Sequence, residues 1–240
     1  MTRLSVNVNK LATLRNSRGK NNPDVLSMTL DIIHYGAQGI TVHPRPDGRH
    51  IRKKDVYDIA KAIHVEFNIE GYPDPDFLAL VNDVKPTQCT LVPDPPNTLT
   101  SNAGWMIEKN LPLLQETIAH LHQHGIRTAL FVDPLKMTAS DIALLKVTGT
   151  DRVELYTESY ADSFNTPSAK KILATYKKVA TEVLQLGIEL NAGHDLNLSN
   201  LRDFVTEIPI KEVSIGHALV CDALQLGMKE TIAKYLACLV

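Results

Sequence analysis

Short apolar stretches alternate with longer stretches of helical spacing along the whole chain. The short stretches are rich in β-branched residues, which favour strands. They cover residues 4–8, 39–42, 66–69, 88–92, 128–132, 152–156, 189–191 and 212–215. The longer stretches follow them in turn and predict helices over 24–35, 55–63, 74–84, 111–124, 138–147, 168–186, 198–208 and 218–239.

Eight strand–helix units of about 30 residues each predict a single (β/α)8 barrel domain spanning residues 1–240. A doubly wound open sheet is the alternative. That fold usually carries a Gly-rich dinucleotide-binding turn after its first strand. Residues 8–11 here are Val-Asn-Lys-Leu, which contain no glycine. Two connections, 9–23 and 93–110, are long and are predicted as loops after strands, at the face where barrels keep their active sites.

The composition is that of a soluble globular protein: 44% apolar residues, 22% charged residues and a net charge of −2. This balance argues against a disordered chain, a nucleic-acid binder and a polybasic membrane anchor. No apolar run is long enough to span a membrane, and because the first predicted strand begins at residue 4 we expect no signal peptide. Cys89, Cys221 and Cys238 form no CxxC pair, so we expect a reducing cytoplasm and no zinc knuckle.

Polar side chains stand at or just past the end of nearly every predicted strand. A carboxylate inside an apolar strand is costly unless it is paired or functional. Glu70 and Glu154 are therefore candidate acid–base groups, with His43 and His194 as partners; pairing of each carboxylate with a neighbouring Arg or Lys is the alternative. The other strand-end residues are Asn7, Asn9, Arg45, Arg49, His50, Thr100, Asp133, Asn191, Gly193, Gly216 and His217.

Two glycine–histidine pairs, Gly193-His194 and Gly216-His217, precede predicted helices. Such turns let backbone N–H groups approach a phosphate, although tight-turn geometry alone would also explain the glycines. Arg18, Arg45 and His50 are further candidate anion ligands, whereas residues 52–54 read as a solvated surface.

Metal and Schiff-base chemistry fit the sequence less well. His120 and His124 have i, i+4 spacing but no HExxH motif, so we expect an exposed helix face and no metal site. The first strand lacks the His-x-His of many metallohydrolase barrels. A Schiff-base aldolase needs a lysine inside the barrel, and Lys10 lies just past a strand end.

Seven segments in register resemble the pyridoxine 5′-phosphate synthase family. They are 6–19 (VNVNKLATLRNSRG), 39–51 (GITVHPRPDGRHI), 68–70 (NIE), 91–93 (LVP), 154–157 (ELYT), 191–194 (NAGH) and 215–218 (IGHA). The resemblance covers essentially the whole chain. It implies a (β/α)8 TIM barrel with extra helices, a homo-octamer built from dimers, and no metal or organic cofactor.

The resemblance also implies a reaction: 1-deoxy-D-xylulose 5-phosphate and 3-amino-2-oxopropyl phosphate condense to pyridoxine 5′-phosphate, phosphate and water. By motif, His43 and Glu70 resemble general bases, His194 a general acid and Glu154 a transition-state stabiliser. The residues that would hold the aminoketone phosphate are Asn7, Arg18, Gly216 and His217, and those for deoxyxylulose phosphate are Arg45, His50 and Thr100.

Three places depart from the family pattern. Many members have Asp and His where this chain has Asn9 and Lys10, Gly where it has Asp195, and a more Gly-rich loop at residues 101–104. We expect Asn9, Lys10 and Asp195 still to contact substrate, Asp195 through its backbone. A phosphosugar isomerase or aldolase on the same barrel, and a phosphometabolite-binding barrel without catalysis, are the alternatives.

Overall fold

Eight parallel strands close into a barrel in sequence order, with β1 hydrogen-bonded to both β2 and β8. The computed structural model describes residues 1–93 and 103–239. The strands are β1 (Arg3–Asn7), β2 (Gly39–Val42), β3 (Glu66–Gly71), β4 (Gln88–Leu91), β5 (Arg127–Val132), β6 (Arg152–Tyr156), β7 (Glu189–Gly193) and β8 (Glu212–Ile215). The barrel prediction is confirmed, and each predicted strand lies within two residues of the observed bounds.

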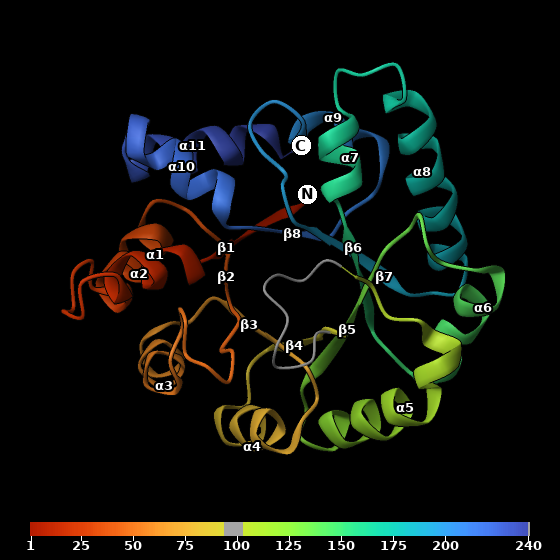
Figure 1. Cartoon of the computed structure of the whole chain (residues 1–240), viewed down its shortest axis with the longest axis horizontal. Helices are drawn as coiled ribbons and strands as arrows, with labels where there is room; N and C mark the ends of the chain where they lie inside the picture. The colour runs from red at the N-terminus through yellow and green to blue at the C-terminus, as the bar shows by residue number, and fades with distance from the viewer. Residues whose placement is uncertain (94–102, 240) are drawn as a thin grey trace.

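Helices surround the barrel as an outer ring (Figure 1). Those that follow the predicted pattern are α2 (Val25–His34), α3 (Lys53–Ala62), α4 (Pro75–Val84), α5 (Ile107–Gln123), α6 (Ala139–Thr148), α8 (Ala169–Gln185) and α9 (Leu201–Glu207). Local sequence sets where they start. Asp74 caps α4 by accepting a hydrogen bond from the Phe77 backbone N–H at 2.9 Å, and Pro75 occupies the first turn.

Four further helices correct the sequence prediction. The connection 9–23 is not a continuous loop, because α1 (Asn9–Asn16) lies within it and buries Leu11, Ala12 and Arg15. A short helix, α7 (Glu158–Ser163), follows β6. The stretch 218–239 is not one helix: Gly227, with φ of 79°, separates α10 (His217–Leu226) from α11 (Met228–Cys238).

The apolar core lies between the barrel wall and the helices, whereas the inside of the barrel is polar. Inward side chains of five strands are linked across it: Ser5 to Thr41 at 2.8 Å, Asn68 to Thr41 at 3.4 Å, Thr90 to Asn68 at 3.0 Å, and Thr90 to Glu154 at 3.5 Å. The Thr90–Glu154 contact passes from β4 to β6 without involving β5, so it crosses the interior. Bulky branched side chains usually fill this space; here a polar chain leads from Ser5 to the candidate acid–base group Glu154.

Candidate active site

His43 and Glu70 lie together at the carboxyl ends of β2 and β3. His43 Nδ1 is 3.8 Å from Glu70 Oε2, and both side chains are nearly buried. Asn9 fixes the backbone here: its Oδ1 accepts a hydrogen bond from the His43 N–H at 2.9 Å, and its own N–H donates to Asn7 Oδ1 at 3.1 Å. Burial and the positive charge of Arg45 lower the pKa of His43 well below its ordinary value. His43 is therefore neutral at pH 7 and able to accept a proton.

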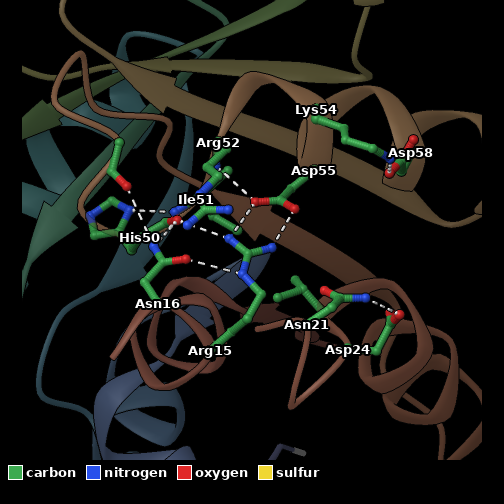
Figure 2. Close-up of polar contacts among 12 residues, drawn as sticks. Arg15, Asn16, Asn21, Asp24, His50, Ile51, Arg52, Lys54, Asp55 and Asp58 are labelled. Carbon is green, nitrogen blue, oxygen red and sulfur yellow. Dashed lines mark hydrogen bonds and ion pairs between the residues drawn. The ribbon is translucent and has the colours of Figure 1, made fainter. Parts of the chain in front are cut away.

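Helix α1 holds the loop that carries His50 (Figure 2). Arg15 donates to Asp55 Oδ2 at 2.9 Å and to the His50 carbonyl oxygen at 3.3 Å, while Asn16 Nδ2 donates to the same carbonyl at 2.8 Å. Burial and the positive charges of Arg45 and Lys10 lower the pKa of His50 to about 4. His50 is therefore neutral at pH 7, and its ring centroid lies 6.2 Å from that of His43.

Sequence reasoning missed the supporting roles of Arg15 and Asn16. Both lie in the connection 9–23, which the sequence predicts as a loop. The signal that could have found them is the spacing of Leu11, Ala12 and Arg15, which places three side chains on one helix face.

Glu154 is buried inside the barrel on β6. Burial raises the pKa of Glu154 to about 8, and the negative charge of the buried Glu212 acts in the same direction. Gly193 on the neighbouring β7 makes room for this carboxyl group, because a Cβ at Gly193 would lie 2.3 Å from Glu154 Oε1. Glu154 is therefore mostly a neutral carboxylic acid at pH 7, able to donate a hydrogen bond or a proton.

His194 follows β7 and packs its ring against Tyr156, with centroids 4.9 Å apart. Its Nδ1 lies 2.9 Å from Asp195 Oδ2. The hydrogen bond with His194 holds the pKa of Asp195 below its usual range, helped by the nearby charges of His217 and Lys10. The buried Thr157 hydroxyl donates to the Gly193 carbonyl oxygen at 2.8 Å and also contacts the His194 carbonyl. Thr157 is a third supporting residue that sequence reasoning left without a role.

Gly216 stands at the start of α10, directly above Asn7 of β1. A Cβ at Gly216 would lie 3.1 Å from both Asn7 Cβ and the Asn7 carbonyl oxygen, so the close approach leaves little room for a side chain here. The first N–H groups of α10 have no partner within the helix, which suits an anion. His217 begins the helix and its Nε2 lies 3.7 Å from Cys221 Sγ.

Comparison with known proteins identifies the family. The sequence profile described as "Pyridoxal phosphate biosynthesis protein PdxJ" matches residues 4–240. The chain belongs to the PdxJ family. Pyridoxine 5′-phosphate synthase from Porphyromonas gingivalis is 54% identical over 98% of each chain, and the one from Parabacteroides distasonis is 53% identical over 100% of this chain and 99% of the relative. The family prediction made from the seven segments is confirmed.

Solved structures support the fold of this PdxJ protein. A mutant tryptophan synthase α-subunit from Pyrococcus furiosus aligns with a TM-score of 0.66 at 13% identity, covering 98% of both chains. A phosphoribosyl anthranilate isomerase aligns with a TM-score of 0.60 at 12% identity, covering 98% of this chain and 97% of the other. At this identity the likeness concerns the barrel alone.

The remaining candidate residues of the PdxJ site differ in burial and in position. Arg45 is buried beside His43 and lines, with it, a cavity of about 670 Å³ that extends toward Tyr72 and Phe77. Lys10 is exposed on the first turn of α1, within electrostatic reach of His50 and Asp195. Arg18 is exposed, two residues beyond the last residue of α1, and its predicted role in binding the aminoketone phosphate stays a prediction. Thr100 lies outside the described residues.

Among residues 1–93 and 103–239, no group of three or more His, Cys, Asp or Glu side chains is placed to hold a metal ion. His120, of the helical pair considered above, instead bonds to Asn82, with Nε2 and Oδ1 3.1 Å apart. Within the same part of the chain, none of the helices has the length and apolar character that crossing a membrane requires.

Proposed function

We propose that this PdxJ-family chain condenses 1-deoxy-D-xylulose 5-phosphate with 3-amino-2-oxopropyl phosphate to pyridoxine 5′-phosphate, phosphate and water. The observation that carries the proposal is the full-length family match, together with His43, Glu70 and His194 at or just past the carboxyl ends of β2, β3 and β7, and Glu154 inside the barrel. Family and enzyme class are those of its relatives; the roles of individual residues below are our proposal.

The four groups supply different protonation states for a reaction that moves several protons. His43 is neutral, with Glu70 close to Nδ1, so this pair accepts protons. Glu154 is held as a neutral acid and His194 lies in hydrogen-bond contact with Asp195, so we assign proton donation to Glu154 and His194. Each properly placed acid or base typically contributes about 10²–10⁴-fold to the rate. The substrate amine attacks the ketone of the second substrate, so the mechanism needs no enzyme lysine.

Two phosphate-binding regions would orient the substrates against each other. The start of α10, with Gly216, His217 and Asn7, suits the aminoketone phosphate. Arg45 and His50 suit the deoxyxylulose phosphate, with Lys10 near enough to add positive charge. Fixing both phosphates turns an encounter of two reactants into a step within one complex.

The test combines both substrates with the purified protein after chelator treatment, and detects pyridoxine 5′-phosphate by mass and absorbance. Product formation supports the reaction and the expectation that neither metal nor cofactor is required. Turnover of one phosphorylated substrate alone would favour a phosphosugar isomerase or aldolase; binding of both without turnover would favour a non-catalytic barrel.

Glu70→Gln gives the residue-level test, because it keeps the shape of the side chain and removes the base. We expect a folded protein with turnover reduced about 10²-fold or more. Near-normal turnover would exclude Glu70 as a base. The cytoplasmic location and the octamer built from dimers belong to this proposal as well; the measured mass of the native assembly tests the octamer.

A further inference from the structure

We propose that Asp195 is a positioning residue for His194: its carboxylate accepts a hydrogen bond from the Nδ1–H group and so leaves Nε2 as the nitrogen that exchanges a proton with substrate. This inference rests on the proposed function, in which His194 is a general acid. It gives the Asp195 side chain a role of its own, in place of the backbone contact expected from the sequence.

The backbone brings the two neighbouring side chains together. Successive side chains of an extended strand point to opposite faces. Here, however, His194 has φ of 85° and Asp195 has φ of 59°, so the chain turns sharply where β7 ends. The resulting distance from Nδ1 to Oδ2 is 2.9 Å, that of a charge-assisted hydrogen bond.

Contacts on both sides hold this turn in place. Thr157 donates to the carbonyl oxygen of Gly193 at 2.8 Å, and Asn200 Nδ2 donates to that of Asp195 at 3.3 Å. The His194 ring packs edge-on against Tyr156 and lies 6.5 Å from the ring of Phe131. Left-handed backbone at two consecutive non-glycine residues is unfavourable, and such geometry persists only where surrounding contacts determine it.

The charges around the pair favour an ionised carboxylate. The hydrogen bond with His194, together with the charges of His194, His217 and Lys10, holds the pKa of Asp195 below the usual range. Tyr156, which packs on the His194 ring, donates a hydrogen bond from its hydroxyl to Glu158, and the Asp133 carboxylate is paired with Lys136 at 3.0 Å. Glu154, beside Gly193, is neutral at pH 7. Asp195 is thus the carboxylate in direct contact with the His194 ring in the described part of the chain.

A carboxylate on one imidazole nitrogen fixes the tautomer and favours the protonated ring, the arrangement used in Ser-His-Asp triads. A purely structural Asp195 would stabilise the left-handed turn and leave proton transfer unchanged. If Asp195 instead contacted substrate directly, its substitution would change KM. The three roles therefore predict different kinetic effects.

The experiment measures kcat and KM for both substrates between pH 6 and pH 9 in Asp195→Asn and Asp195→Ala. Asp31→Asn, an exposed carboxylate on α2, is the matched control. In Asp195→Asn we expect kcat to fall about 10-fold or more, KM to stay within about threefold, and the alkaline limb of kcat to move to lower pH. In Asp195→Ala we expect a larger fall in kcat than in Asp195→Asn. Unchanged kcat and pH profile in Asp195→Asn, or a change in KM alone, would overturn the inference.

Nitrogen NMR of the His194 ring separates this inference from the proposed function, because it needs no turnover. The signal is assigned with His194→Gln. We expect Nδ1 to carry the proton in the unsubstituted protein at pH 8, and the two tautomers to mix in Asp195→Ala. Absence of product from the unsubstituted protein would refute the proposed function only, whereas an unprotonated Nδ1 would refute the role of Asp195 only.

Discussion

Replacing Glu154 with Gln should make the fold more stable at neutral pH while lowering turnover. Glu154 has a folded-state pKa of about 8 against an ordinary value of 4.5. The folded protein therefore keeps a proton that the unfolded chain releases. Its contribution to stability is fully present below pH 4.5 and is lost progressively as the pH rises toward 8. Gln has the same shape and never ionises, so it removes this pH-dependent loss.

The size of this gain in stability follows from the difference between the ordinary glutamate pKa of 4.5 and the pH of the measurement. At pH 7 this is roughly 2.5 pH units at about 1.4 kcal/mol each, or on the order of 3 kcal/mol. For a chain of this size that corresponds to a rise in Tm of about 6–12 °C. Turnover should fall about 10²-fold, because the proposed transition-state contact loses its acidic proton.

The assay is thermal unfolding of the original and Glu154→Gln proteins from pH 5 to pH 9, with the difference in Tm plotted against pH. Glu189→Gln on the next strand is the matched control. Burial alone would raise the pKa of Glu189, but hydrogen bonds from Lys211 and Arg152 lower it, so its curve should not rise across this range. A Tm difference for Glu154→Gln that stays constant from pH 5 to pH 9 would refute a neutral Glu154.

Two further predictions concern neighbouring residues. Gly193→Ala should destabilise the fold by about 1–3 kcal/mol and lower kcat, since the added Cβ would lie 2.3 Å from Glu154 Oε1. Denaturant unfolding measures the lost stability. If the shorter side chain of Glu154→Asp, added to Gly193→Ala, restored none of that stability, the steric explanation would be contradicted. His50→Gln should flatten the loss of stability on acidification: the pKa of His50 is lowered to about 4, so its contribution is present above pH 6.5 and lost as the pH falls toward 4. We expect His50 to account for about 2 kcal/mol of the stability lost between pH 6.5 and pH 4, a value discounted for partial solvent access. If stability fell equally steeply with pH in the original and His50→Gln proteins, a buried neutral His50 would be contradicted.

The sequence by itself determined the strands, because β-branched apolar runs separated by helical stretches have few other ways to pack. Three strands, 39–42, 152–156 and 212–215, have the bounds read from the pattern. It also determined the family, since seven segments in register carry far more information than any one residue. Local signals failed for α1, whose polar composition hid a buried face, and for the break at Gly227.

Tertiary structure alone decided the electrostatics of the site. Nothing near Glu154 in the sequence indicates that Glu212 lies inside the same barrel and disfavours its ionisation. Likewise, the sequence predicts only a backbone contact for Asp195, whereas the left-handed turn directs its carboxylate onto His194. Protonation depends on burial and on charges a few ångströms away in space, and folding brings these together from strands far apart along the chain.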